Sequence, residues 1–484
     1  MIWNKLKNNQ SGMILMTALV ITGLFLVMAS GLSGISFLQT KLYKQQLAKH
    51  QALHLAEAGI NYYRWHLAHS QNDFMDGTGT DPGGGGAPYG PYTHNYASPD
   101  GSITGKYELT ITPPAVGSTI VGIKAVGWLD SYPNIKRGIT VRYGIPSLAH
   151  YSILANSDVW FGNSEKVSGE MHSNGGIRMD GSNDSLVTSA RSTWTCTSNF
   201  GCSGSSSCHA PCTWASSKCT CPGVFGAGTS SSLWTSPVTT VDYNALTANI
   251  SAIKTSAQSS GVYLTVNGSN KGYHIIFKNN GHFDARLVSA VNNGISQLDD
   301  NWSSYVNTSE SIRTEGSATD YAIPANGLIF VNDGDVWVEG VVKGRATLVA
   351  ATLPENSSKY RTIFINNNLT YFARDGSNIL GLIAQKDVKV PKHAPNTLTI
   401  DAVMLSQYGR VFYNNYSSHS VKTKIEVYGG ILTNKTWTWT WVSGSSTLDG
   451  YDDTALIYDP LATFAPPPSF PTTGQYTLVS WDEK

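Results

Sequence analysis

An uncharged apolar run near the amino terminus constrains this chain most. No Asp, Glu, Lys or Arg lies between Lys7 and Lys41, and residues 13–37 read MILMTALVITGLFLVMASGLSGISF. As one helix this run would be about 37 Å long at 1.5 Å per residue, which is enough to cross a bilayer. Three interpretations fit such a run: a cleaved secretory signal, a simple transmembrane anchor, and a leader whose apolar helix stays in the mature protein.

The flanks of the run favour the third interpretation. A secretory signal has an apolar core of about 7–15 residues followed by a small-residue cleavage site, and this core is longer. The basic leader ends instead in Gly12, directly before the run. Beyond Lys41 apolar side chains are interleaved with polar ones, which is typical of an amphipathic helix. These apolar residues are Leu47, Leu53, Leu55, Ala56, Ile60 and Trp65. We therefore expect one transmembrane and stalk helix over residues 13–70.

This amino-terminal region resembles type IV prepilins and pseudopilins, and among them the PilX-like minor pilins. The resemblance rests on the basic leader 1–12, Gly12, the apolar Met13, the long helix and the AEAG segment at residues 56–59. It implies that a prepilin peptidase cuts between Gly12 and Met13 and that the new amino terminus is methylated. It also implies that the partners are other pilins, pilus-assembly proteins and the membrane.

One position departs from the pilin pattern. Most pilins carry a Glu at the fifth mature position, where this chain has Thr17. That Glu is thought to pair with the amino terminus of the subunit ahead, and pseudopilins that cap the filament tip also lack it. The resemblance therefore implies a tip subunit. The alternative is a single-pass anchor with no role in a pilus, and lysines on both sides of the run give no orientation by the positive-inside rule.

The remaining composition indicates a secreted, mainly β protein. The net charge is zero and only 14% of the residues are charged, which argues against nucleic-acid binding by bulk charge. A Gly/Pro-rich linker is expected over residues 71–104, followed by a pilin-like antiparallel sheet over 105–146, where apolar and polar residues alternate. We therefore expect a long helix, a small sheet and a large β-rich addition, displayed outside the cell with the amino terminus in the cytoplasm.

The sequence of this large addition shows the pattern of an irregular parallel β-solenoid. Short Val- and Ile-rich strands end in Asn, Asp or Gly in two blocks, residues 147–189 and 326–442. These blocks resemble a bactofilin-like solenoid found on PilX-type surface proteins, and a β-sandwich is the alternative. Between the blocks, residues 226–325 predict a helix with Leu246, Ile250 and Ile253 on one face, and a hairpin turning at residues 279–281. Residues 443–484 predict an extended tail that packs along the solenoid.

All six cysteines lie in a Ser/Gly-rich insertion at residues 190–225. They are Cys196, Cys202, Cys208, Cys212, Cys219 and Cys221. An even number in such a segment predicts three disulfides and an oxidising, extracytoplasmic place, with 15 connectivities possible. Zinc with His209 as an extra ligand is the alternative, although paired C-x2-C knuckles are missing.

The sequence contains few signs of catalysis. The acidic residues on the apparent solenoid turns read best as turn residues rather than paired catalytic carboxylates; they are Asp180, Asp184, Asp333, Asp335 and Glu339. His172 reads better as a turn or core residue than as a base or ligand. We expect no enzyme, no cofactor and no metal, although calcium at the acidic turns stays open.

One surface feature suggests a ligand. Trp437, Trp439 and Trp441 recur at period two, so that a strand would place the three indoles on one side to stack on sugars. Alternatively, they close the end of the solenoid. The sequence thus favours a non-enzymatic minor pilin or pilus-assembly protein, with adhesion at the tip as a hypothesis. The alternative function is a membrane-anchored solenoid that binds or cleaves surface polysaccharide.

Overall fold

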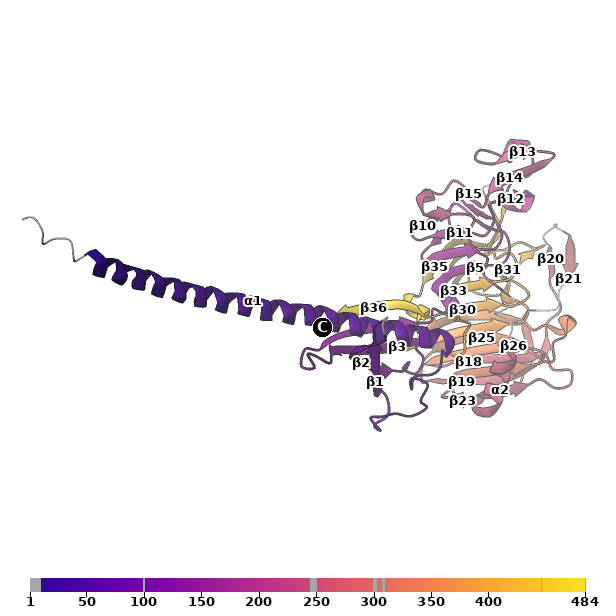
Figure 1. Cartoon of the computed structure of the whole chain (residues 1–484). Coiled ribbons are helices and arrows are strands. Elements are labelled where there is room, and N and C mark those ends of the chain that lie inside the picture. Colours follow the sequence, from indigo (N-terminus) through magenta and orange to yellow (C-terminus); the bar gives the residue numbers. More distant parts are fainter. Residues whose placement is uncertain are drawn as a thin grey trace, which may run out of the picture. The chain divides into compact units, whose positions relative to one another are not determined.

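The chain consists of two compact units. The computed structural model describes residues 10–98, 101–243, 250–298, 303–306, 310–444 and 446–483, so most of the expected leader lies outside the described residues. The first unit extends to Pro114, continues over Ile120–Gly144 and resumes at Tyr476, while the second comprises Ala115–Thr119 and Ile145–Gln475 (Figure 1). The second unit is therefore an insertion into the chain of the first.

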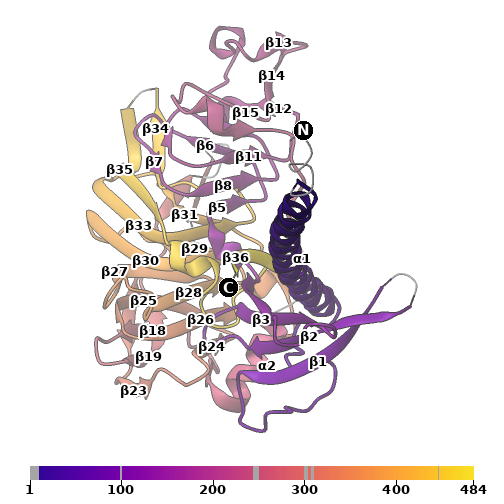
Figure 2. The ribbon, with the colours of Figure 1, turned by 60° about the vertical axis from the view of Figure 1, so that its left-hand side comes forward.

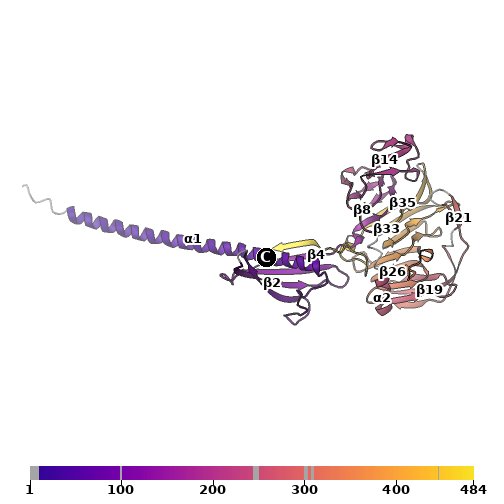
Figure 3. The same cartoon turned by 45° about the vertical axis from the view of Figure 1, so that its right-hand side comes forward.

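The first unit combines one long helix with an antiparallel sheet (Figure 3). Five strands pair in the order β1-β2-β3-β4-β36. The elements are α1 Gln10–His69, β1 Tyr89–Ala97, β2 Ile103–Thr112, β3 Ile120–Leu129, β4 Arg137–Gly144 and β36 Thr477–Glu483. A long amino-terminal helix with a small sheet confirms the expected pilin-like fold class of this unit.

The carboxyl-terminal part of α1 packs on this sheet along one stripe. Its buried side chains are Ala48, Ala52, Leu55, Ala56, Ile60, Tyr63 and Leu67. They follow a spacing of three or four residues and meet the alternating inward residues of the strands, such as Leu109 and Ile123. Two residues of the expected apolar side are not buried in this contact: Leu47 and Trp65 are exposed.

Two strands of this sheet come from segments for which the sequence suggested no such role. Strand β1 lies within the expected linker, where Tyr92 is buried against the helix side of the sheet. Strand β36 belongs to the expected tail, yet it pairs with β4 in this sheet rather than along the solenoid. The tail also contains β35 Ser446–Tyr458, so that residues 443–484 are not simply extended.

The second unit is built on a parallel ladder, which agrees with a solenoid and not with a β-sandwich. One run of this ladder is β24-β26-β28-β30-β33, with every pair parallel (Figure 2). A second ladder runs β18-β25-β27-β29-β31, again with parallel pairs. The strands of this part are β17 Val262–Thr265, β18 Gly272–Phe277, β24 Leu328–Asn332, β25 Asp335–Val342, β26 Arg345–Ala351, β27 Ile363–Tyr371, β28 Ile379–Ala384, β29 Val388–Val390, β30 Thr397–Ser406, β31 Val411–Tyr413, β32 Asn415–Tyr416, β33 Val421–Thr433 and β34 Thr440–Ser443.

The two solenoid blocks form one continuous stack in a non-sequential order. The first strand of the first block, β5 Tyr151–Ala155, pairs in parallel with β33 at the end of the second block. From β5 the ladder continues through β8 and β11 to β16. The other strands here are β6 Val159–Phe161, β7 Lys166–Val167, β8 Glu170–Ser173, β9 Ile177–Met179, β10 Ser182–Asn183, β11 Val187–Ser189, β15 Val224–Phe225 and β16 Trp234–Thr235. One buried apolar cluster runs through both blocks.

The helix and the hairpin expected between the blocks are present in the described residues. Helix α2 Ile250–Ser260 buries Ile250 and Ile253, while Leu246 lies outside the described residues. Strand β18 forms the expected hairpin with β19 His282–Val291. The remaining strands are β20 Ser296–Leu298, β21 Ser304–Val306, β22 Ile312–Glu315 and β23 Thr319–Ala322, and the cysteine-rich segment adds β12 Thr193–Cys196, β13 Thr213–Ala215 and β14 Lys218–Pro222.

Candidate functional site

The first candidate site is the amino-terminal half of α1. Large apolar side chains from Met13 to Leu42 are exposed, typically by more than half of their surface. This is the one helix of the described chain that is long and apolar enough to cross a membrane, and none of its most apolar window is buried within the protein. An exposed apolar surface of this size requires lipid or other helices as its surroundings.

Several hydroxyl side chains within this half form hydrogen bonds with the backbone of their own helix. Thr17 donates its hydroxyl to the carbonyl of Met13 at 2.9 Å and lies 3.0 Å from that of Ile14. Four further hydroxyls donate in the same way to carbonyls three or four residues back; they belong to Thr22, Ser30, Ser33 and Thr40. Such back-bonding leaves these groups with no unmet donor in a lipid environment.

The expected processing site lies inside this helix. Gly12 and Met13 are consecutive residues of α1, and a Cβ added at Gly12 would meet no described atom within 4 Å. Gly12 is therefore not required for packing within this chain. A larger residue there leaves the rest of the fold undisturbed, so any effect on processing would come from the peptidase.

Glycines set the distance between α1 and its sheet. A Cβ at Gly127 of β3 would lie 2.3 Å from the carbonyl oxygen of Ala52, and one at Gly59 would lie 2.8 Å from the ring of Tyr107. With Ala52 and Ala56 fully buried, helix and sheet touch along their backbones. The AEAG segment therefore has a packing role in this chain.

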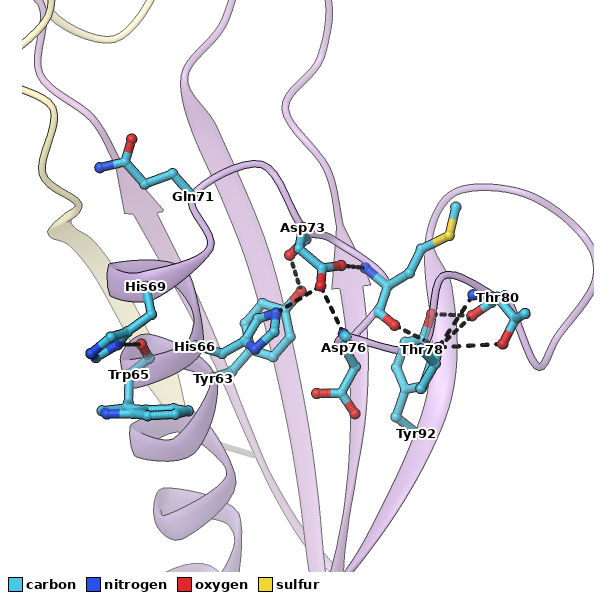
Figure 4. Close-up of polar contacts among 12 residues, drawn as sticks. Tyr63, Trp65, His66, His69, Gln71, Asp73, Asp76, Thr78, Thr80 and Tyr92 are labelled. Carbon is cyan, nitrogen blue, oxygen red and sulfur yellow. Dashed lines mark hydrogen bonds and ion pairs between the residues drawn. The ribbon is translucent and has the colours of Figure 1, made fainter.

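The end of α1 is fixed by a polar loop, drawn in Figure 4. The hydroxyl of Tyr63 donates to the carbonyl of Asp73 at 3.0 Å, and Nε2 of His66 lies 3.2 Å from the Asp73 carboxylate. That carboxylate also accepts the backbone N–H groups of Met75 and Gly77, each at 2.8 Å. These contacts turn the chain from the helix into the sheet.

The second candidate site is a groove of about 1020 Å³ in the second unit. Its lining includes aromatic, acidic and basic side chains from the first solenoid block, the cysteine-rich segment and β34. Trp160, Phe200 and Trp441 are half-buried, so part of each ring faces solvent. Aromatic rings beside carboxylates and amides form the kind of surface that binds sugars.

One side of the groove is held rigid by an ion pair. Arg178 and Asp180 are joined by a 2.7 Å Nε–Oδ2 contact, and the same oxygen accepts the indole N–H of Trp160 at 2.8 Å. The Arg178 guanidinium lies 4.5 Å from the centre of the Trp160 ring. Trp160 is thereby fixed at the groove before any ligand arrives.

The cysteine-rich segment contributes Phe200 to this groove. The six cysteines form three disulfides, Cys196–Cys202, Cys208–Cys219 and Cys212–Cys221. The first encloses Phe200, whose carbonyl accepts Arg178 Nη1 at 2.7 Å. The adjacent Gly201 has φ +77, and a Cβ there would lie 2.2 Å from that nitrogen. Local sequence gave no signal for this contact.

Two of the three tryptophans lie in the core instead of forming the possible ligand surface. Trp437 and Trp439 are 2% and 1% exposed and belong to the main core, where the centre of the Trp437 ring lies 5.3 Å from that of Phe161. They precede the strand β34 instead of lying along it, so no row of three indoles forms on one side. Trp441 alone is half-buried at the groove, and its indole donates to the carbonyl of Tyr413 at 3.0 Å.

Asp184, Asp335 and His172 occupy structural positions, and Glu339 lies within β25 rather than in a turn. The Asp184 carboxylate accepts a hydrogen bond from the backbone N–H of Gly169 at 2.9 Å. The Asp335 carboxylate accepts one from the backbone N–H of Thr362, also at 2.9 Å. His172 is buried between Thr188 and Asn174, at 2.9 and 3.0 Å. Burial lowers the pKa of His172 and raises that of Asp335. Asp180 differs, because it lines the groove.

Glu165 is an additional carboxyl in the groove lining. It is almost fully buried, and this burial raises its pKa to about 7 although the Thr454 hydroxyl donates to it. A neutral carboxyl at this position can donate a hydrogen bond as well as accept one. Glu165 could not be identified from the sequence, because a Glu within the turn sequence GNSEK carries no sign of its burial.

The comparisons with known proteins add little. No protein-family model and no curated protein matches the chain. Among solved structures the chain is similar to the competence-associated pilin ComZ from Thermus thermophilus, with 13% identity and a TM-score of 0.31, covering 90% of this chain and 98% of that chain. The pilin-like character of the chain is carried by the helix and sheet of its first unit.

Proposed function

We propose that this chain is a non-enzymatic minor pilin or pilus-assembly protein of a type IV pilus. One observation carries the proposal: α1 is a single continuous helix, exposed and apolar in its first half and packed on its own sheet in its second half. A simple anchor needs only the first half. A helix that also packs in the core of the first unit suits a subunit whose transmembrane segment moves from the membrane into a filament.

The leader defines the maturation step of this proposal. Cleavage after Gly12 and methylation of Met13 would leave the apolar helix as the mature amino terminus. The helix would first cross the cytoplasmic membrane once, with its amino terminus in the cytoplasm. The three disulfides support an extracytoplasmic place for the second unit, because such bonds persist in oxidising compartments.

A tip position follows from two features. Thr17 stands where most pilins have the Glu that contacts the subunit ahead, and its hydroxyl is already bonded within its own helix. The second unit, inserted between β4 and β36, adds bulk that would crowd neighbours along a close-packed shaft. Immunogold labelling of purified pili tests this position: label at one end is expected, and label all along the fibre would contradict it.

Adhesion to surface polysaccharide is a second candidate role, and the groove favours it. Trp160 and Trp441 would stack on sugar rings while Asp158 and Asp180 accept hydrogen bonds from hydroxyls. A glycan-binding screen of the full chain tests this role. Trp441→Ala should weaken binding at least tenfold, whereas Trp214→Ala, at an exposed position of the cysteine-rich segment, should leave it unchanged.

Processing gives the genetic test of the pilin role. Gly12→Ala should be cleaved and should enter pili, because the residue is still small. Gly12→Trp should accumulate uncleaved in the membrane, although its fold is unaffected. Normal incorporation of the Gly12→Trp protein into pili would contradict the proposal.

A further inference from the structure

A cluster of buried polar side chains inside the second unit resembles a reaction centre more than a packing contact. Its members are Gln297 on β20, Glu310, Lys389 on β29 and Asn414, and their exposed fractions are 0%, 1%, 2% and 3%. Lysine is almost never fully buried in proteins unless it is paired, and here an amine, a carboxyl and a carboxamide are buried together.

The amine and the carboxamide share one carboxylate oxygen. Nζ of Lys389 forms an ion pair with Oε1 of Glu310, and the same oxygen accepts Nε2 of Gln297 at 2.7 Å. Nζ also lies 3.3 Å from Oε1 of Gln297. Because a C=O bond is about 1.2 Å long, the amine is within about 4.5 Å of the carboxamide carbon. A nucleophile, an acyl group and a proton carrier are thus in contact.

The carbonyl oxygen of Gln297 has a separate donor. Nδ2 of Asn414 donates to this oxygen, where negative charge would develop if the amine attacked the carbon. A donor fixed at that point stabilises a tetrahedral intermediate. Asn414 therefore corresponds to an oxyanion donor.

Glu310 is held by two further residues, one at its backbone and one at its carboxyl group. The indole of Trp337 donates to the backbone carbonyl of Glu310 at 2.7 Å, and the hydroxyl of Tyr416 donates to its second carboxylate oxygen. The ring of Phe412 lies 5.3 Å from the Lys389 nitrogen. These rings exclude water, which would otherwise compete with the amine for the carbonyl carbon.

Burial also favours the neutral form of the Lys389 amine. It lowers the pKa of Lys389, and the neighbouring Glu310 carboxylate only partly opposes this change. A lysine must be neutral to act as a nucleophile, and desolvation is a general way to make it so. Within the ion pair, transfer of one proton from Nζ to Glu310 yields a neutral amine beside a neutral carboxyl.

We propose that Lys389 and Gln297 join in an intramolecular isopeptide bond, with Glu310 as the catalytic acid and base. Nζ attacks the carboxamide carbon and the Nζ–Cδ bond forms. Glu310 gives its proton to Nε2 and takes one from Nζ. The Cδ–Nε2 bond then breaks and ammonia leaves, so that a secondary amide remains and Glu310 is unchanged. The step needs no oxidant and no further reactant.

The cross-link would tie an insertion to the solenoid. Strand β20 belongs to the segment between the hairpin and β24 and pairs with β32, whereas β29 is a strand of the parallel ladder. The linked residues are 92 positions apart, so the bond would close a long loop of the unfolded chain. The modification does not depend on the role of the chain in a pilus.

Mass spectrometry of the full chain after reduction of its disulfides tests the bond directly. The second unit should be lighter by one ammonia than its sequence requires, and digestion should release a branched peptide joining the segments of Gln297 and Lys389. The branched peptide comes entirely from the second unit, so processing at the amino terminus does not affect its detection. In denaturing gels the wild-type chain should migrate differently from Lys389→Arg, because only the former is branched.

Variants separate catalysis from packing. Lys389→Arg and Glu310→Gln should abolish the loss of ammonia, whereas Lys392→Arg should retain it, because the Lys392 amine donates to Ser418 instead. If the wild-type chain has the mass calculated for its unmodified sequence, the proposal is overturned, whatever the variants show. A loss of water would also overturn it, because that would join Lys389 to Glu310 and not to Gln297.

Discussion

Trp481 in the last strand of the chain is paired with Val141 of β4, so the carboxyl terminus completes the sheet that the amino-terminal helix packs on. The two ends of the chain therefore belong to one unit, and the second unit lies between them in sequence. The large insertion Ile145–Gln475 is therefore joined covalently to the pilin-like unit at both of its ends, next to β4 and next to β36. A single terminal fusion would be joined at only one end.

Truncation after Tyr476 should expose the edge of β4 but leave the core of the first unit in place. All side chains of β36 are exposed, so the main loss is that of its backbone hydrogen bonds, each contributing about 1 kcal/mol. Hydrogen exchange should accelerate in β4 and stay unchanged in β2. Unchanged protection of β4 would contradict the pairing of Val141 with Trp481.

The close contact of α1 with β3 predicts a strong effect of one methyl group. Gly127→Ala should destabilise the first unit by about 1–3 kcal/mol, because its Cβ would collide with the backbone at Ala52 and Ala56. Gly138→Ala is the matched control, since the nearest atom to its Cβ lies at 3.6 Å. Thermal unfolding of both variants measures the difference, and equal midpoints would show that the helix does not approach the sheet as described.

The raised pKa of Glu165 predicts a pH dependence of stability. Burial raises this pKa from the usual 4.5 to about 7, so the folded state holds the proton more tightly than the unfolded state. The protonated Glu165 therefore contributes at most about 3 kcal/mol to the free energy of unfolding. This contribution is complete below pH 4.5 and decreases as the pH rises to about 7. Denaturant unfolding of Glu165→Gln should show a smaller decrease over this range. Glu170→Gln, at an exposed position of β8, should behave like the wild type.

The disulfide Cys196–Cys202 should keep Phe200 at the groove. Replacing both cysteines by serine should loosen the intervening segment at a cost of about 2 kcal/mol, because this bond closes a short loop. Limited proteolysis should then cut within residues 197–201. The same replacement of Cys208 and Cys219 should leave this segment protected, and equal susceptibility of both variants would contradict the role of the first bond.

Local patterns predicted much of the fold. The uncharged run predicted α1, and the turn at residues 279–281 predicted the hairpin of β18 and β19, because both signals lie within one stretch of chain. The short strands ending in Asn, Asp or Gly predicted the solenoid. Each of these features depends on the spacing of neighbouring residues, which the sequence displays directly.

Contacts between distant segments could not be predicted in this way. Nothing in the alternation of residues 421–433 identifies β5 as its partner, and nothing in the last residues identifies β4. The burial of Trp437 beside Phe161 could not be predicted for the same reason, since the two residues are far apart in the sequence. The cluster around Lys389 likewise comes from separate segments, each of which is unremarkable alone.

The central claim is that α1 is a processed pilin helix, and the mass of the mature amino terminus tests it most directly. Mass spectrometry of the amino-terminal peptide from the native protein should show a chain that begins at a methylated Met13. An amino terminus that still carries Met1 and the residues up to Gly12 would contradict the account and leave a simple membrane anchor.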